Sequence, residues 1–271
     1  MLVAAQRSRS LLCVGLDPDP AQMALPDVAE FNRAIIEATS DLVCAYKPNL
    51  AFYEALGVPG LLALEKTLQH IPSHIVTIGD AKRGDVQPSS RFYARAMFDR
   101  WGFDAVTVIP YLGSDSLEPF LERPEKGVFV LCRTSNPGAR EFQDLELTGL
   151  EWERRPLFEF VALRAAAWDT HGNVGLVVGA TYPEEIKHLR ELCPDMPLLI
   201  PGVGAQGGAL ETAVRYGVDR NGRRAIINAS RSVLYASRDR ASFAEAARRE
   251  ALRVRDLINE TLQREGKPWP R

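Results

Sequence analysis

The sequence predicts an α/β fold, a closed (β/α)8 TIM barrel in which residues 1–271 form a single domain. Eight short apolar runs alternate with segments of helical periodicity along the chain. Most of these runs are apolar at successive positions, which is typical of parallel strands that are buried on both faces. The chain has 271 residues, and a barrel of this kind typically needs about 250. These three observations together favour eight strand–helix units that close into a barrel.

Each apolar run predicts one strand. In chain order, strands are expected at residues 11–17, 43–49, 75–81, 105–110, 127–134, 174–180, 197–204 and 225–230. An open, doubly wound sheet is the alternative arrangement, and its usual signature is a G-x-G-x-x-G turn after the first strand. Here the first strand ends in GLDPDP, so the closed barrel is preferred.

Helices are predicted between the strands, with Pro or Gly at many of the joints. The clearest are expected at residues 26–42, 59–71, 89–102 and 183–193. Apolar residues recur at helical spacing within residues 237–265, which predicts a closing helix packed on the barrel. Residues 136–151 are long and polar for a strand-to-helix loop. We expect either a lid-like functional loop or a surface insertion there.

Composition and charge exclude several classes of protein. The chain carries 33 basic and 35 acidic residues, whereas a dedicated nucleic-acid binder usually has a basic excess. The four cysteines form no C-x-x-C pair or zinc-ligand spacing, and buried free thiols fit a reducing compartment. No apolar stretch approaches the roughly 20 residues of a membrane helix, and the run near the N-terminus is too short for a secretory signal. We therefore expect a soluble cytoplasmic protein with no nucleic-acid or membrane partner.

Charged residues gather at the predicted carboxyl ends of the strands, where barrel enzymes have their active sites. Asp17 ends the first strand and Lys47 the second, and the third runs into the segment GDAKRGD with Asp80, Lys82 and Asp85. In an extended chain, Asp80 and Lys82 point to the same side. A structural salt bridge is one interpretation, because such charges are costly to bury unpaired. The nearby Lys47 favours a preorganised network whose groups titrate together.

A phosphate site is predicted after the last two strands. The loop PGVGAQGG, with Gly202 and Gln206, follows the seventh strand, and NASR, ending in Arg231, follows the eighth. Loops at these two positions commonly form the phosphate site of the barrel. The guanidinium fork of Arg suits a phosphate group. The alternative is a tight turn that binds nothing.

Taken in order, the segments GLDPDP, YKPN, GDAKRGD, VTVIPYLGSDSLEPF, TSNPGA, PGVGAQGG and NASR resemble the orotidine 5′-monophosphate decarboxylase family. The similarity is greatest to its branch of longer bacterial chains, called type 2. It covers nearly the whole chain. The D-x-K-x-x-D core is shared with related barrel enzymes, whereas the full set in this order is specific. The resemblance implies cofactor-free and metal-free decarboxylation of orotidine 5′-monophosphate to uridine 5′-monophosphate, the last step of de novo pyrimidine biosynthesis.

The resemblance also implies a homodimer with shared active sites and a Lys-Asp-Lys-Asp network. Lys82 would protonate C6 of the substrate. Asp80 would sit beside the substrate carboxylate, and Lys47 would hold the ribose and orient Asp80. Asp85 would cross the dimer interface to complete the network of the partner, with Ser89 beside it on the ribose. Many relatives have Thr in place of Ser89, and a serine hydroxyl can still donate.

The remaining roles that the resemblance implies concern substrate binding. Asp17 would bind a ribose hydroxyl and Ser135 the pyrimidine. Gln206 and Arg231 would hold the 5′-phosphate at the loop that begins with Gly202. The neighbouring Asn136 stands where other relatives have His.

Loss of CO₂ from C6 leaves an electron pair without an ordinary delocalising sink. No cofactor motif is visible in the sequence, so we expect electrostatic stabilisation and proton delivery by Lys82. We expect repulsion between Asp80 and the substrate carboxylate to contribute less to the rate than the ammonium of Lys82 does.

Four alternative functions are compatible with these residues. One is a Mg²⁺-dependent phosphosugar enzyme such as a hexulose-phosphate synthase, although the second strand offers no extra acidic ligand. Another is a Schiff-base aldolase that uses Lys47 or Lys82. The others are a catalytically silent phosphonucleotide-binding protein and, least favoured, a structural or interaction protein.

Overall fold

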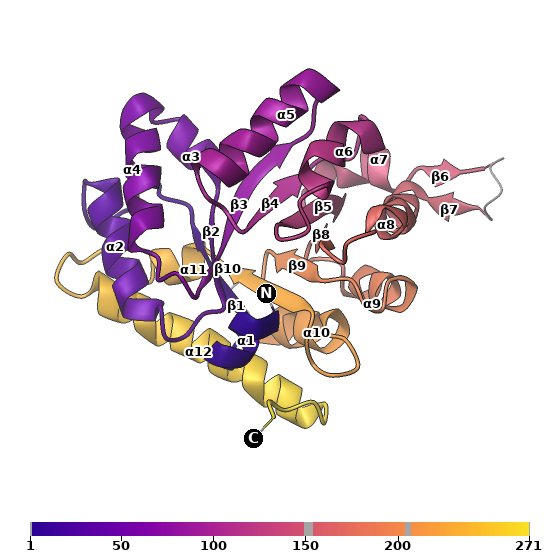
Figure 1. Cartoon of the computed structure of the whole chain (residues 1–271). Helices are drawn as coiled ribbons and strands as arrows, with labels where there is room; N and C mark the ends of the chain where they lie inside the picture. The colour runs from indigo at the N-terminus through magenta and orange to yellow at the C-terminus, as the bar shows by residue number, and fades with distance from the viewer. Residues whose placement is uncertain (1, 149–153, 204–206, 271) are drawn as a thin grey trace.

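The computed structural model describes residues 2–148, 154–203 and 207–270. Its centre is a closed barrel of parallel strands in the order β1-β10-β9-β8-β5-β4-β3-β2 (Figure 1). The barrel strands are β1 Leu12–Leu16, β2 Ala45–Pro48, β3 Val76–Arg83, β4 Ala105–Val108, β5 Gly127–Arg133, β8 Val174–Val178, β9 Leu198–Pro201 and β10 Ala225–Ala229. Each lies within or overlaps one predicted run. The predicted fold class is confirmed.

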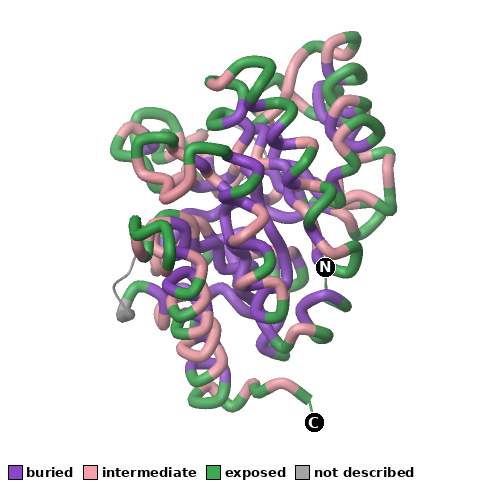
Figure 2. Tube along the Cα trace, turned by 90° about the vertical axis from the view of Figure 1, so that its left-hand side faces the viewer, coloured by how far each residue is buried: buried purple, intermediate pink, exposed green. Residues whose placement is uncertain are grey.

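The apolar runs form strands because both of their faces are covered. Every residue of β1, β2, β4, β8 and β10 is buried. Their Val and Ile side chains fit the pleated surface of a buried sheet. In Figure 2 the buried residues are concentrated in the central strands, and exposed residues lie mostly on the outer helices and loops. This packing makes the barrel rigid, and the polar residues at the strand ends lie along its carboxyl-terminal edge.

Helices surround the barrel (Figure 1). They are α1 Leu2–Ser8, α2 Val28–Thr39, α3 Leu50–Glu54, α4 Gly57–His70, α5 Gln87–Arg95, α6 Ser114–Leu121, α8 Leu157–Trp168, α9 Pro183–Leu192, α10 Gly207–Gly217, α11 Arg231–Leu234 and α12 Phe243–Arg264. The helix α12 is the predicted closing helix, and it packs against α2 and α10. Within the described ranges, no helix combines the length and apolar character that a membrane crossing requires.

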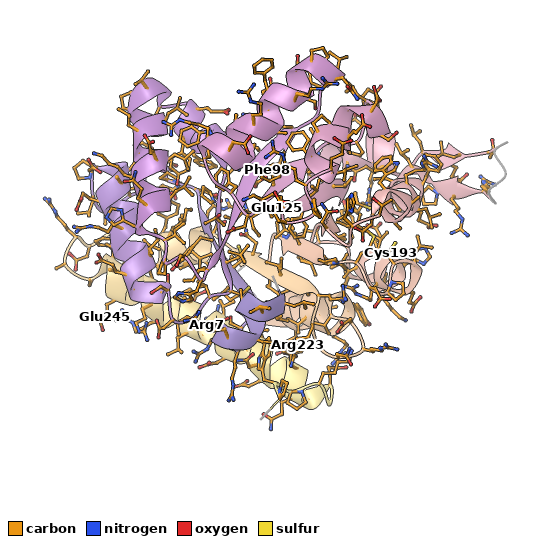
Figure 3. The ribbon with its side chains drawn as sticks, in the orientation of Figure 1. Arg7, Phe98, Glu125, Cys193, Arg223 and Glu245 are labelled. Carbon is orange, nitrogen blue, oxygen red and sulfur yellow. The ribbon has the colours of Figure 1, made fainter. Side chains whose placement is uncertain are left out.

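The predicted helix at residues 89–102 differs in detail from the structure. The helix α5 begins two residues earlier, with Pro88 in its first turn, where a missing N–H breaks no helical hydrogen bond. It continues into a π-helical turn, η1 Ala96–Arg100. Phe98, which is labelled in Figure 3, lies in this turn. It packs edge-on against Phe120 of α6, with 6.1 Å between ring centroids.

The long polar segment predicted at residues 136–151 contains short regular elements. These are the 3₁₀ turn η2 Pro137–Ala139, the helical turn α7 Arg140–Gln143 and the strand β6 Glu146–Leu147. Strand β6 pairs antiparallel with β7 Arg155–Pro156, and this hairpin projects from the barrel in Figure 1. Residues 149–151 of the predicted segment lie outside the described residues. A lid-like movement of the segment stays a prediction.

Candidate active site

A cavity of about 800 Å³ opens at the carboxyl ends of β1, β2, β9 and β10. Five of the predicted site residues line it together: Asp17, Lys47, Asp80, Gly202 and Arg231. The other lining residues are Asp19, Gln22, Asn49, Phe52, Pro201, Val203, Asn228, Ser230, Ser232 and Tyr235. The closed barrel therefore brings together residues that are far apart in the sequence, as the strand-end argument predicted.

Two lysines share the carboxylate of Asp80. The Nζ of Lys47 donates to Oδ2 at 2.7 Å, and the Nζ of Lys82 donates to Oδ1 at 2.6 Å. The side chain of Lys47 is only 4% exposed, whereas that of Lys82 is 45% exposed. Lys47 is thus fixed inside the barrel rim, and Lys82 carries the ammonium group that a ligand can reach.

Lys47, Asp80 and Lys82 favour the charged forms of one another. Burial by itself raises the pKa of Asp80, but the ammonium groups of Lys47 and Lys82 outweigh it and bring that pKa down to about 2. Burial likewise lowers the pKa of Lys47, and the carboxylates of Asp80 and Asp17 more than compensate, so its pKa lies above its ordinary value. Both Asp80 and Lys47 are therefore charged at neutral pH. Lys47, Asp80 and Lys82 therefore form one hydrogen-bonded array of charged groups, and its catalytic role stays a prediction.

Asp85 and Ser89 lie elsewhere. Asp85 follows the end of β3, and its Oδ1 accepts the N–H of Val86 at 2.7 Å, while Ser89 lies in the first turns of α5. Among the residues that the structure describes, the lining of the cavity includes neither of them, and it also omits Lys82 and Ser135. The chain does not bring these two predicted residues into its own cavity.

The predicted phosphate end of the cavity is formed by the loop after β9 and the start of α11. Arg231 is the first residue of α11, and Gly202 has a φ of +88°, which a glycine adopts without strain. A Cβ on Gly202 would lie 3.8 Å from the Oγ of Ser135, so Ser135 is next to the cavity on the β5 side. Gln206 lies outside the described residues.

Two buried acceptors in the cavity have no donor. The Oδ1 atoms of Asp17 and Asn228 are inaccessible to solvent and accept no hydrogen bond from the described part of the chain. Buried polar atoms of this kind normally have a partner.

Sequence reasoning missed Asn228 and Thr107. Asn228 is the fourth residue of β10, and its polarity inside an apolar run was the available signal. Thr107 is buried in β4, and its Oγ1 donates to Oδ1 of Asp80 at 3.0 Å. It is likewise the only hydroxyl residue in its strand. Across the described ranges, no group of three or more His, Cys, Asp or Glu side chains could hold a metal ion.

Comparison with known proteins decides the family. The model of the orotidine 5′-phosphate decarboxylase / HUMPS family matches residues 10–247. The chain belongs to this family. It is 53% identical over 262 residues to the orotidine 5′-phosphate decarboxylase of Dehalococcoides mccartyi, with 96% of each chain covered. It is 55% identical over 259 residues to that of Thermomicrobium roseum, covering 93% of this chain and 91% of the relative.

Solved structures agree with this assignment. The OMP decarboxylase of Leishmania donovani superimposes with a TM-score of 0.81 at 39% identity, covering 95% of this chain and 97% of that one. The orotidine 5′-phosphate decarboxylase family converts orotidine 5′-monophosphate to uridine 5′-monophosphate in pyrimidine biosynthesis, and its enzymes are carboxy-lyases. The resemblance and the enzyme class predicted from the sequence are confirmed. The predicted assignment to the type 2 branch stays a prediction.

Proposed function

We propose that this chain decarboxylates orotidine 5′-monophosphate without a cofactor, with Lys82 as the general acid that protonates C6. The observation that carries the proposal is the Lys47–Asp80–Lys82 array beside the cavity. It combines a fixed carboxylate, a buried cation and an ammonium group that a ligand can reach. Family membership supports the reaction, and this array supplies the chemistry that it requires.

The reaction needs a cation at the carbon that loses CO₂. The bond between C6 and the carboxylate breaks, and its electron pair stays on C6. The ammonium of Lys82 stabilises that charge and then transfers a proton to C6, leaving a neutral amine that solvent reprotonates. Asp80 holds the ammonium in place through the 2.6 Å hydrogen bond, and Lys47 keeps Asp80 ionised.

Binding at a distance from C6 positions the substrate. Arg231 holds the 5′-phosphate with the loop of Gly202 and Gln206, Asp17 accepts a hydrogen bond from a ribose hydroxyl, and Ser135 contacts the pyrimidine. The place of Asp17 in the lining of the cavity supports the ribose assignment. Binding energy from the phosphate can orient the reacting carbon against Lys82.

The unit that functions is proposed to be a homodimer with shared active sites. Among the described residues, Asp85 pairs with neither lysine of its own chain, which fits a role for Asp85 and Ser89 in the site of a second copy. Apolar side chains near them are exposed, including Val86 and Phe92, and Tyr111 after β4 is 81% exposed. Apolar surface of this kind is typical of contact between subunits.

Two further proposals concern the chain as a whole. Residues 1–271 act as a single domain, which the continuous ring of eight strands supports. The cytoplasm is its compartment, which the four free and buried cysteines support.

The decisive test follows the absorbance change when EDTA-treated protein is mixed with orotidine 5′-monophosphate. We expect rapid turnover that disappears in Lys82→Ala and persists in the control Lys66→Ala, because Lys66 is exposed on α4. General-acid catalysis typically contributes about 10²- to 10⁴-fold. Turnover of Lys82→Ala above about a tenth of the wild-type rate would rule out Lys82 as the acid.

Other outcomes identify the alternatives. Loss of turnover in EDTA, restored by Mg²⁺, would indicate a metal-dependent enzyme. Trapping of the substrate by borohydride would indicate a Schiff base. Tight binding of uridine 5′-monophosphate without turnover would indicate a silent binding protein.

A further inference from the structure

A single hydroxyl group connects the two catalytic residues of β3. Thr107 lies in β4 and is 1% exposed. Its Oγ1 donates to Oδ1 of Asp80 at 3.0 Å, and the same oxygen accepts the backbone N–H of Lys82 at 3.0 Å. A hydroxyl has one proton to donate and lone pairs to accept, so both contacts are made at once.

The backbone at Lys82 explains why this N–H needs a side-chain acceptor. The register between β3 and β4 is regular at Ile78 and Gly79 and then shifts before Arg83. Within this irregularity Lys82 has a φ of +49°, a left-handed conformation that is uncommon for any residue other than glycine. The N–H of Lys82 is bound by the hydroxyl of Thr107, and a backbone donor that is shielded from water without an acceptor would be unfavourable.

These contacts close a ring of hydrogen bonds. Lys82 is bound at both ends: its N–H by Thr107 and its Nζ by Asp80. Oδ1 of Asp80 accepts from both the Nζ of Lys82 and the hydroxyl of Thr107. The hydroxyl of Thr107 therefore influences the direction of the Lys82 ammonium group in two ways, through the backbone of Lys82 and through the carboxylate of Asp80.

We propose that Thr107 is a positioning residue for the decarboxylation, which sets the place of the Lys82 ammonium relative to C6. The inference rests on the proposed role of Lys82 as the acid. Lys47 holds the other carboxylate oxygen, Oδ2, independently of Thr107. Arg231 begins α11 and Asp17 follows β1, so both lie on elements other than β4, which carries Thr107. Loss of the hydroxyl thus disturbs Lys82 while the substrate-binding end of the cavity stays intact.

The test compares Thr107→Val with Thr107→Ser. Valine keeps the shape of threonine and removes the hydroxyl, whereas serine keeps the hydroxyl. We expect Thr107→Val to lower kcat about 10- to 100-fold, because small misplacements of a catalytic group have effects of this size. The KM and the affinity for uridine 5′-monophosphate stay close to wild type. Thr107→Ser recovers most of the kcat.

The matched control is Thr77→Val. Thr77 lies on β3, and its hydroxyl bonds to Oδ2 of Asp104 at 3.0 Å, away from the cavity. We expect this variant to keep the wild-type kcat. If Thr107→Val does not fold, Thr107→Ala replaces it, since Ala and Ser at this position differ by the hydroxyl alone.

Three results would overturn the inference. These are a wild-type kcat in folded Thr107→Val or Thr107→Ala, a rise in KM at constant kcat, and a Thr107→Ser variant as impaired as the variant without a hydroxyl. Lys82→Ala is measured in the same series. If it retains turnover, the role of Lys82 fails; if it is inactive while Thr107→Val is fully active, only the positioning role fails.

Discussion

The phenolic hydroxyl of Tyr235 donates to the backbone carbonyl of Asp17 at 2.8 Å. The same oxygen accepts the N–H of Asp19 at 2.7 Å. Tyr235 directly follows α11, which begins with Arg231. One hydroxyl therefore connects the segment after the first barrel strand to the helix that begins with Arg231.

Removing this hydroxyl should loosen the ribose end of the cavity. A hydrogen bond is worth about 0.5–1.5 kcal/mol, so we expect Tyr235→Phe to raise the KM for orotidine 5′-monophosphate about 2- to 10-fold with little change in kcat. Tyr216→Phe on α10 is the matched control. Steady-state kinetics of both variants decide the matter. An unchanged KM in Tyr235→Phe would contradict the positioning of Asp17 by Tyr235.

Arg231 is expected to act on binding and hardly on the chemical step. Hydrogen bonds to charged groups are worth about 1.5–3 kcal/mol, so Arg231→Ala should raise KM about 10- to 150-fold. Arg231→Lys keeps the charge without the planar fork, so its KM should lie between those of the wild type and Arg231→Ala. Arg249→Ala, at an exposed position of α12, serves as the control. A wild-type KM in Arg231→Ala would remove Arg231 from the phosphate site.

Shared active sites predict complementation between two inactive variants. We mix Lys82→Ala with Asp85→Ala protein under conditions that exchange subunits. In a mixed dimer, one site then carries both changes and the other carries neither. Random exchange should restore about a quarter of the wild-type sites. No recovery despite exchange, shown by differently tagged subunits, would place Asp85 in the site of its own chain.

The pKa of Asp80 makes its contribution to stability depend on pH. In the folded protein this pKa is about 2, against an ordinary value of 3.8. The ionised carboxylate thus stabilises the fold fully above pH 4, and this stabilisation is lost as the pH falls toward 2. The difference between these two pKa values corresponds to about 2 kcal/mol in the free energy of unfolding.

Urea unfolding at pH 5 and pH 3 checks this effect. The free energy of unfolding of the wild type, relative to Asp80→Asn, should fall by about 1 kcal/mol at pH 3. The same difference at both pH values would show that the pKa of Asp80 is not lowered in the folded protein.

The sequence predicts the barrel well because its signals are local. Each strand is an apolar run such as residues 11–17, and burial on both faces leaves little choice of structure. The hairpin of β6 and β7 escapes prediction because each strand is two residues long, too short to show any periodicity. The π-helical turn after α5 has no sequence signal that we recognise.

The site was predictable where a charge stands at a strand end, as for Lys47 and Asp80. It was not predictable where the function depends on backbone conformation. Thr107 looks like an ordinary residue of a buried strand, and its role follows only from the left-handed backbone of Lys82. After β3 the chain turns into α5, and the predicted role of Asp85 in the site of a second copy depends on a contact between chains that local spacing does not encode.

Closure of the barrel also sets the order of events during synthesis. Leu12 of β1 pairs with Ile227 of β10, so the ring closes only after nearly the whole barrel has left the ribosome. Until then β1 and β9 are open edges, which readily pair with other chains. Asp17 and Arg231 first share a cavity at that moment. We therefore expect the nascent chain to need chaperone protection most just before its last strand emerges, and a chain truncated before that strand to aggregate.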